Sequence, residues 1–329
     1  MEAIDAVITW VDGSDPEHAR KRARFLGADA AASHAAADAT RFGDCGEVAW
    51  CVASLLRFAP WLRRIHIVAD GQQPAFLERI AHTALAQRVR LVDHREIFAG
   101  YEQYLPTFSN RSIEAVLHRI PGLAPRFLYL NDDFMLLRAV APEDFFRGEA
   151  VVLRGRWRDG AARARWQRWR GAVSKLLRGG RAPARVARPG QHEAQQLSAR
   201  MAGFPARYFQ FPHCPAPLRR DTIADWFAAN PAALERNLSF RLRSAEQFLT
   251  VALANHLEIA SGHAVIDNSL QTLRIQPGRE SEKALREELA QAEANPALAF
   301  LCVQSLDEAE PAQRQLVFDF MEGRIGPSL

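Results

Sequence analysis

Short apolar segments alternate with amphipathic segments in the N-terminal part of the chain. Residues 6–11 are apolar and mostly β-branched, and the polar residues 12–16 follow them directly, which predicts a buried strand that ends in a turn. Proline is favoured in the first turn of a helix, so a helix is expected to begin at Pro16 with His18 in solvent. Residues 47–58 place apolar side chains at i, i+3, i+4, i+7 and i+8, the spacing of an amphipathic helix.

The same alternation continues as far as an acidic turn. Further strands are predicted at residues 65–69, 89–92 and 127–130, and further helices at residues 76–82 and 112–119. Strands that alternate with helices form βαβ units, which pack their strands in parallel. The sequence therefore predicts an α/β fold with a mainly parallel sheet flanked by helices.

The pattern is less regular in two places. Residues 28–40 are rich in alanine and polar side chains, which is typical of a helix or a mobile lid, and residues 156–200 are rich in arginine and broken by glycine and proline. We interpret the second stretch as a partly helical insertion that separates two parts of one globular unit. The expected divisions are residues 1–150, 151–205 and 206–329, and the last part carries helical patterns at 221–229, 243–258, 281–293 and 312–322 and a strand at 300–303.

Composition excludes several classes of protein. The chain has 329 residues, of which 48% are hydrophobic and 24% charged, so it can bury a large core and is not expected to be disordered. Its four cysteines include no CxxC pair, which argues against a structural zinc site and against a disulfide framework. The sequence has no run of eighteen apolar residues and no signal-peptide pattern, so we expect a cytoplasmic protein without a transmembrane helix.

Charge is concentrated in the insertion. Residues 154–188 carry a net charge of +11, which leaves −7 for the rest of a chain whose total is +4. Within them, residues 165–178 place Trp166 and Trp169 on one helical face among basic side chains. This face either packs on the body of the protein or lies on an anionic membrane or polyanionic polymer, which would place the protein at the inner face of the cytoplasmic membrane. No nucleic-acid-binding motif is present, so nucleic acid is not an expected partner.

Three predicted strands end in polar turns, at residues 10–13, 68–71 and 130–133. Ligands of open α/β sheets bind beyond the carboxyl ends of the strands, so these turns mark the expected rim of a site. Asp132 and Asp133 are adjacent carboxylates that suit a divalent cation, expected to be Mg²⁺, on a diphosphate. The simpler interpretation of such a pair is a helix cap or a turn.

Other candidates lie alone in the sequence. Asp12 precedes Gly13, which would let the backbone approach a ligand closely, although an Asx turn explains the same pattern. His213 lies between prolines, which suits a rigid general base, although a lone histidine is more often structural. Arg241 and Arg243 suit a phosphate clamp, although surface ion pairs are the usual fate of such arginines.

Several blocks of residues resemble the Stealth family of polysaccharide phosphotransferases, which includes bacterial capsule enzymes and the animal lysosomal-enzyme N-acetylglucosamine-1-phosphotransferase. The first block is DAVITWVDGSDP at residues 5–16, and the similarity extends over nearly all of residues 4–147. It includes RFGD at 41–44, IHIVADGQ at 65–72, LPTF at 105–108, LHRIPGL at 117–123, YLNDDF at 129–134 and PEDFF at 142–146. A third block around His213 and RLRSAE at 241–246 is similar more weakly.

This resemblance implies a fold, a reaction and roles for individual residues. The implied fold is Rossmann-like or glycosyltransferase-A-like, with residues 1–150 binding a nucleotide sugar. The implied reaction moves a sugar-1-phosphate from a UDP-sugar, usually a UDP-hexosamine, to a hydroxyl of a glycan or phosphoglycan and releases UMP. Catalytic roles fall to His213, Arg243 and Asp133, metal binding to Asp132 and Asp133, and substrate binding to Trp10, Asp12, Gly13, Asp44, Asp70, Gly71, Asn131 and Arg241.

Two departures from the family pattern keep alternatives open. Gln304 and Ser305 follow the strand at 300–303, where the family usually has Asn-Asp, and Asp307 is the candidate to replace the missing acid. Cys45 and Gly46 differ from the usual residues before Glu47. The alternatives are a glycosyltransferase that releases UDP and a catalytically weakened homologue that binds polymer or membrane.

Overall fold

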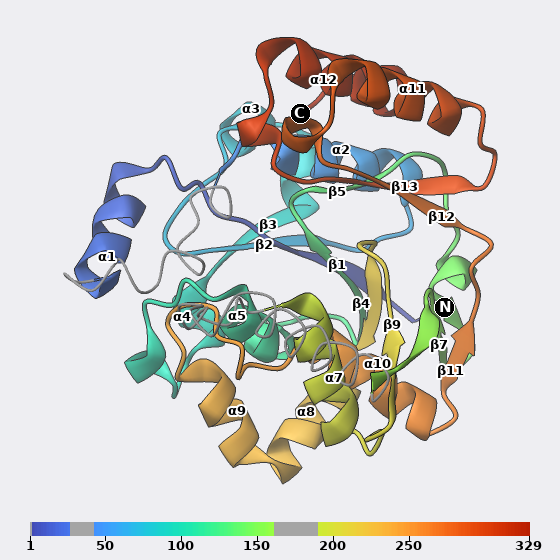
Figure 1. Ribbon diagram of the computed structural model, residues 1–329. Coiled ribbons are helices and arrows are strands. Elements are labelled where there is room, and N and C mark those ends of the chain that lie inside the picture. Colours follow the sequence, from blue (N-terminus) through green and yellow to red (C-terminus); the bar gives the residue numbers. More distant parts are fainter. Residues whose placement is uncertain (1, 27–42, 161–189) are drawn as a thin grey trace, which may run out of the picture.

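A five-stranded sheet forms the centre of the computed structural model, which describes residues 2–26, 43–160 and 190–329 (Figure 1). The strand order is β10-β4-β1-β2-β3, in which β4, β1, β2 and β3 are parallel and only β10 is antiparallel. The predicted α/β class with a mainly parallel sheet is thus confirmed. These strands are β1 (Ile4–Thr9), β2 (Ile65–Ala69), β3 (Val89–Asp93), β4 (Arg126–Asn131) and β10 (Ala216–Arg219).

Helices cover both faces of this sheet, which explains why most positions of its strands are apolar. Ile8 packs into a core with α2 (Glu47–Phe58), whereas the neighbouring Val7 packs into a second core with α5 (Asn110–Val116). Successive side chains of a strand point to opposite faces, so a strand buried on both sides has no polar alternation. The second core also contains side chains of α8 (Arg220–Ala229), α9 (Pro231–Leu238) and α10 (Thr250–Ala260).

Three smaller sheets extend the central one. The strand β13 (Leu298–Val303) lies between β12 (Gln271–Ile275) and β5 (Phe134–Leu136), and helices α11 (Glu282–Glu293) and α12 (Pro311–Ile325) pack with it. The remaining strands are β6 (Phe146–Arg147), β7 (Ala150–Leu153) and β11 (Ala264–Ile266) in one sheet, and β8 (Arg156–Asp159) and β9 (Arg207–Gln210) in another. The other helices are α1 (Pro16–Leu26), α3 (Phe76–Ile80), α4 (His94–Ile97) and α7 (Gln191–Met201).

The structure differs from the sequence prediction at residues 243–258, where the helix begins only at Thr250. The side-chain oxygen of Gln247 accepts the backbone N–H of Ser244, and its amide donates to the carbonyl of Asn237. These bonds hold residues 244–247 in a turn and leave Arg243 in a loop. A second difference is His18, which is buried against Phe108 rather than exposed.

Some of the remaining predictions concern residues that the structure does not describe. The possible lid at 28–40 and the basic helix at 165–178 lie outside the described residues. The segments next to the latter are built into the body of the protein, because β8 pairs with β9 and α7 packs on α10. In the part of the chain that the structure describes, no helix is both long and apolar enough to cross a membrane.

A buried carboxylate, Asp5, joins the first strand to its neighbours. Its oxygens accept hydrogen bonds from Arg63 at 2.6 and 2.9 Å and from the backbone N–H of Ala124 at 2.9 Å, and His66 lies 3.0 Å away. Asp5 and His66 are both fully buried. The hydrogen bonds from His66 and Arg63 outweigh the effect of burial and hold the pKa of Asp5 well below its usual range.

We predict that Asp5→Asn lowers the free energy of unfolding by about 3 kcal/mol at pH 7, because it leaves buried donors without a charged acceptor. A carboxylate with a depressed pKa stabilises the protein above the pKa of the unfolded state, and this contribution disappears as the pH falls below about 4. Urea unfolding at pH 7 and pH 3 should therefore show a smaller difference between variant and wild type at pH 3. Asp221→Asn, at an exposed acid, is the control, and equal stability of the two variants at pH 7 would contradict the prediction.

Candidate active site

A cavity of about 390 Å³ opens at the carboxyl ends of the parallel strands. Trp10 follows β1, Asp70 follows β2, and Asn131 ends β4 and is followed by Asp132 and Asp133; side chains of all five line this cavity. Carboxyl ends of parallel strands meet at one edge of a sheet, which brings these segments together from distant parts of the sequence. The loops after β13 and β12 and the loop that carries Arg243 complete the wall.

One side of the cavity carries an excess of buried negative charge. Burial and the neighbouring charges of Asp133, Glu47 and Asp44 raise the pKa of Asp132 well above its usual range. Burial raises the pKa of Asp133 to about 7 and that of Glu47 to about 7. The Oδ1 atom of Asp133 is buried and has no hydrogen-bond partner among the residues that the structure describes. Such a cluster is costly unless a cation enters it.

Neighbouring groups fix these carboxylates in place. The Sγ atom of Cys302 lies 3.6 Å from Oδ2 of Asp133, and the backbone N–H of Val303 donates to the carbonyl of Asp133 at 3.0 Å. Asp44 accepts a hydrogen bond from Nε1 of Trp10 at 3.1 Å. We call Asp44, Glu47, Asp132 and Asp133 the acidic wall. It is held by β13, by Trp10 after β1, and by β4, which directly precedes Asp132.

A buried polar network forms the floor of the cavity. The hydroxyl of Tyr129 donates to Asn131 at 2.9 Å, and the side-chain amide of Asn110 donates to Glu114 at 3.1 Å and reaches the same hydroxyl at 3.1 Å. Burial raises the pKa of Glu114 to about 7, although the charge of Arg243 acts in the opposite direction. Arg243 thus interacts with the carboxylate of Glu114 on the floor and lines the same cavity as Asp132 and Asp133.

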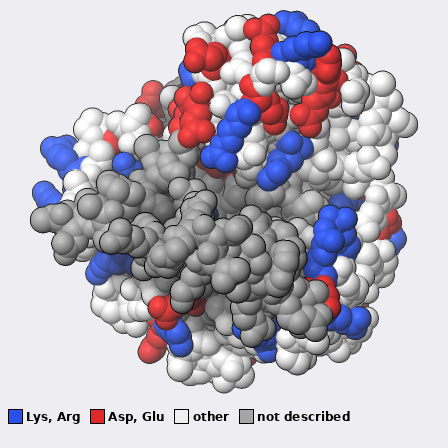
Figure 2. Space-filling view, in the orientation of Figure 1, with Lys and Arg blue, Asp and Glu red and all other residues white. Residues whose placement is uncertain are grey.

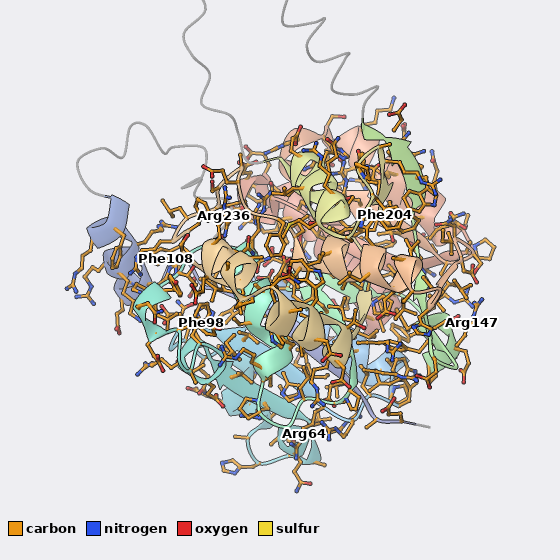
Figure 3. All side chains as sticks on the ribbon, turned by 90° about the horizontal axis from the view of Figure 1, so that it is seen from below. Arg64, Phe98, Phe108, Arg147, Phe204 and Arg236 are labelled. Atoms are coloured by element: carbon orange, nitrogen blue, oxygen red, sulfur yellow. The ribbon has the colours of Figure 1, made fainter. Side chains whose placement is uncertain are left out.

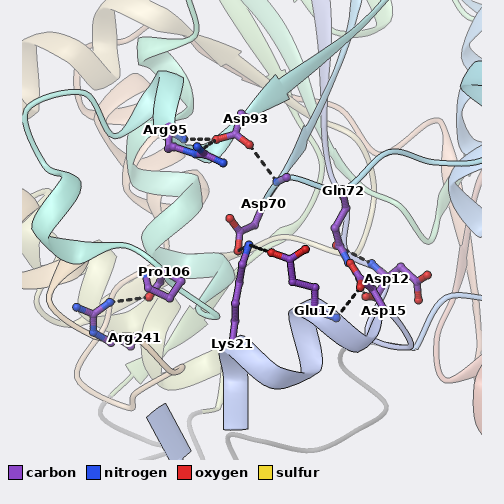
Figure 4. Close-up of polar contacts among 11 residues, drawn as sticks. Asp12, Asp15, Glu17, Lys21, Asp70, Gln72, Asp93, Arg95, Pro106 and Arg241 are labelled. Carbon is purple, nitrogen blue, oxygen red and sulfur yellow. Dashed lines mark hydrogen bonds and ion pairs between the residues drawn. The ribbon is translucent and has the colours of Figure 1, made fainter. Parts of the chain in front are cut away.

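Basic groups surround Asp70 at another corner of the cavity (Figure 4). The ammonium of Lys21 lies 3.4 Å from Oδ2 of Asp70. His18 and His94 line the same corner, and burial lowers the pKa of His94 to about 4. Both histidines are therefore neutral at pH 7, and Lys21 balances the charge of Asp70.

Two of the residues that depart from the expected family pattern, Gln304 and Ser305, also line the cavity, whereas Cys45 and Gly46 do not. Ser305 has a φ of 56°, in the left-handed region that Asn and Asp adopt more readily than Ser. Asp307 lies on the wall beside Gly43, where an added Cβ would come within 2.6 Å of the Asp307 carboxyl carbon. The contact requires a glycine at position 43 and places a carboxylate two residues after Ser305.

Five of the predicted substrate-binding residues are not among those that line the cavity: Asp12, Gly13, Asp44, Gly71 and Arg241. Asp12 forms an Asx turn, since its Oδ1 accepts the backbone N–H and the hydroxyl of Ser14. The guanidinium of Arg241 donates to carbonyl groups, including that of Pro106 at 2.8 Å, and Figure 4 shows it turned toward that loop. Gly71 donates its N–H to Asp93 at 3.0 Å.

His213 lies beside the acidic wall rather than on it. It precedes β10, whose first residue pairs with Tyr129, so the turn that carries His213 lies near the carboxyl end of β4. Its ring meets the ring of Phe134 edge-on at 6.2 Å, and Phe134 follows Asp133 directly. Burial, with the charges of Arg274 and His192, lowers the pKa of His213 to about 4, so the ring is neutral and can accept a proton at pH 7.

Sequence reasoning missed several residues of the cavity and its floor. Asn110, Glu114 and Glu47 lie in helices, where their polar side chains gave no sign of facing a site. Glu114 and Glu47 are both buried. A lone charged residue in an otherwise apolar helix can indicate such burial, and this signal could have found them. His94 follows β3 directly, so the rule applied to three strand ends would have found it at a fourth.

The acidic wall fits a divalent cation that takes only part of its ligands from the protein. Among residues 2–26, 43–160 and 190–329, no group of three or more His, Cys, Asp or Glu side chains is arranged to hold a metal. The unpartnered oxygen of Asp133 and the raised pKa values nevertheless point to a missing positive charge. This donor set suits Mg²⁺, which usually binds one or two carboxylates and completes its shell with phosphate and water.

Two family models match the chain. Residues 2–30 match Stealth protein CR1, conserved region 1, and residues 41–153 match Stealth protein CR2, conserved region 2. The receptor polysaccharide phosphotransferase WefC of Streptococcus oralis is 30% identical over 278 residues, covering 82% of this chain and 81% of that protein.

Other relatives match less than half of this chain. An exopolysaccharide phosphotransferase of Streptomyces coelicolor is 46% identical over 149 residues, which are 45% of this chain and 24% of that protein. A capsular polysaccharide phosphotransferase of Actinobacillus pleuropneumoniae is 38% identical over 150 residues, covering 45% of this chain and 40% of that protein. These matches thus span less than half the length of either relative. Among solved structures, the galactosyltransferase LgtC with donor and acceptor sugar analogs is 11% identical, with a TM-score of 0.43, over 97% of this chain and 96% of that one.

We predict that Glu114→Gln flattens the pH dependence of stability. A buried carboxyl whose pKa is about 7 when folded and near 4.5 when unfolded makes the protein less stable as the pH rises between these values. The loss of stability from pH 5 to pH 8 should therefore shrink by about 2 kcal/mol in the variant. Urea unfolding at both pH values measures it, with the exposed Glu246→Gln as control, and an unchanged difference would refute the assignment.

Proposed function

Because the chain belongs to the Stealth family, we propose that it is a phosphotransferase of capsular or exopolysaccharide synthesis. It moves a sugar-1-phosphate, of the hexosamine class, from a UDP-sugar to a hydroxyl of a glycan and releases UMP. The observation that carries the proposal is the cavity itself, which is lined both by the half-buried pair Asp132 and Asp133 and by Arg243 at the carboxyl edge of a parallel sheet. Anionic carboxylates and a cationic guanidinium are the groups that a metal-bound diphosphate requires.

The donor diphosphate would lie between these charges. Asp132 and Asp133 would hold a divalent cation, which supplies positive charge to the diphosphate oxygens when it is bound. Burial of both carboxylates strengthens that interaction, because little water competes for the charge. Trp10, Asp70 and Asn131 line the rest of the cavity and are the groups that would contact the nucleoside and sugar.

The acceptor hydroxyl would attack the phosphorus that carries the sugar. Its oxygen forms the new P–O bond, the P–O bond to the uridylyl phosphate breaks, and UMP leaves with the electron pair. Arg243 would stabilise the charge on the transferring phosphate, and Glu114 beneath it would orient the guanidinium. His213 would take the proton of the hydroxyl, a role for which the neutral ring is suited.

Attachment to a membrane is a separate proposal. The basic and tryptophan-rich residues 165–178 favour an anionic surface, as expected of a peripheral protein at the inner face of the cytoplasmic membrane. These residues lie outside the described part of the chain, so this contact stays a prediction.

We expect the protein to release UMP when it is incubated with a panel of UDP-sugars, Mg²⁺ and a short phosphoglycan acceptor. Chromatography of the nucleotide products measures it, because attack on phosphorus releases UMP whereas attack on the anomeric carbon releases UDP. Release of UDP would move the assignment to a glycosyltransferase. No release across the panel, in the presence of a bound donor, would favour a homologue that binds polymer without turning it over.

We predict that Asp133→Asn and His213→Gln each lower kcat at least 100-fold, since each removes a group that acts on the reacting atoms. The control is Asp221→Asn, which changes an exposed acid on α8 and should keep wild-type activity. Thermal unfolding would show that each variant is folded. Full turnover by either folded variant would remove the role assigned to that residue.

A further inference from the structure

The strands β8 and β9 form a two-stranded sheet whose two faces differ in character. Side chains of directly paired residues lie on the same face of an antiparallel sheet, and Arg156 pairs with Gln210 while Arg158 pairs with Tyr208. The opposite face carries Trp157 and Phe209, whose rings pack at 5.9 Å as part of the protein core. One face is thus anchored in the core, and the other presents two exposed arginines.

Arg158 is held in place by a neighbouring side chain, and no described residue neutralises either arginine of this face. Nε of Arg158 donates to the side-chain oxygen of Gln210 at 2.7 Å, a contact that leaves its charge unchanged. Neither Arg156 nor Arg158 forms an ion pair with any residue that the structure describes. Asp159, the acidic residue of β8, lies directly opposite Arg207 in the strand register, and both residues belong to the other face of the sheet.

This arrangement differs from that at the α11–α12 end of the molecule. There, acidic and basic side chains are intermingled over the surface (Figure 2). Arg286 of α11, for example, lies 2.8 Å from Glu282 one turn earlier. The arginines of β8 therefore differ from surface charges, such as that of Arg286, which a neighbouring side chain of opposite sign compensates.

The same face leads to His213. Gln210 precedes His213 by three residues, so their Cα atoms are at most about 10 Å apart. His192 of α7 lies between them, because its Nδ1 is 3.5 Å from the amide of Gln210 and its charge acts on the ring of His213. Figure 1 shows α7 beside β9, which agrees with their contacts.

Basic groups also occur at the far end of these strands. A cavity of about 180 Å³ is lined by Arg200 of α7 and Arg207 of β9, together with Tyr208 and Gly160. Phe204 (Figure 3), which follows α7, also lines it, and its ring packs at a tilt against Trp157 with 5.4 Å between the centroids. Arg207 is six residues from His213, which limits the length of this surface to about 20 Å.

We propose that the face formed by Arg156, Arg158, Gln210 and His192, here named the β8 face, binds phosphodiester groups of the acceptor glycan. An acceptor chain seated there would run toward His213 and present its terminal hydroxyl to the donor site. Guanidinium groups bind phosphate oxygens through two parallel hydrogen bonds, and the phosphate supplies the negative charge that this face lacks. The proposal rests on the proposed function, since it concerns the acceptor of that reaction.

Direct binding tests the β8 face without any turnover. The probe is a fluorescein-labelled oligosaccharide of hexosamine units joined by phosphodiesters, and its comparison is the same sugar chain without phosphate. Fluorescence anisotropy is measured with the full chain and without nucleotide. We expect binding of the phosphodiester probe that weakens as NaCl rises, and at least tenfold weaker binding of the neutral chain.

The variant Arg156→Gln/Arg158→Gln should raise the Kd for the phosphodiester probe about fivefold, the size expected for two exposed charge contacts. The matched control is Arg64→Gln/Arg286→Gln, which removes the same charge at the amino end of β2 and on α11 and should leave the Kd unchanged. An unchanged Kd in the first variant would overturn the proposal, as would equal binding of the neutral chain. So would a wild-type protein that ignores the probe but binds phosphatidylglycerol vesicles through these arginines.

The two proposals fail separately. No nucleotide is present in the binding experiment, so a protein that releases UMP but ignores the probe refutes only the β8 face. A protein that binds the probe through Arg156 and Arg158 but releases no UMP refutes only the phosphotransferase assignment.

Discussion

The close packing of several carboxylates in a poorly solvated part of the molecule is the constraint on which this site depends. Asp132, Asp133, Glu47 and Asp44 act on one another through a poorly solvated wall, and burial raises the pKa of three of them. Proteins rarely keep such clusters for stability, because each uncompensated carboxylate opposes folding. The rest of the fold holds these residues in place. Val303 of β13 donates a backbone hydrogen bond to Asp133, and Trp10, which follows β1, donates one to Asp44.

The same constraint orders the chemistry of the site. A cation bound there would favour the ionised carboxylates, because its charge offsets the effect of burial on their pKa values. Arg243 and Glu114 form a second, opposite pair of charges on the floor, which keeps the guanidinium beside the cavity without drawing it into the acidic wall. A diphosphate placed between wall and floor would meet positive charge from both directions.

Periodicity along the chain was sufficient to predict the parallel strands of the central sheet, because these strands are short, mostly apolar runs that alternate with helical patterns. It was also sufficient to place Asp70, Asn131, Asp132 and Asp133 at one edge. Periodicity could not place Glu114, because its surroundings include Tyr129, which is 15 residues further along the chain. It also missed the turn before Thr250, which depends on hydrogen bonds of the Gln247 side chain. His18 was wrongly expected in solvent because its cover, Phe108, comes from a distant loop.

The change from the family's Asn-Asp to Gln304-Ser305 is best understood through backbone geometry. Ser305 has a φ of 56°, a left-handed conformation that Asp or Asn adopts at lower cost, so the turn suits the residue types that the family resemblance leads us to expect there. Asp307 lines the same cavity two residues later, and its carboxyl group packs against Gly43, which has no Cβ to collide with it. A carboxylate therefore remains on this turn although Ser305 carries none.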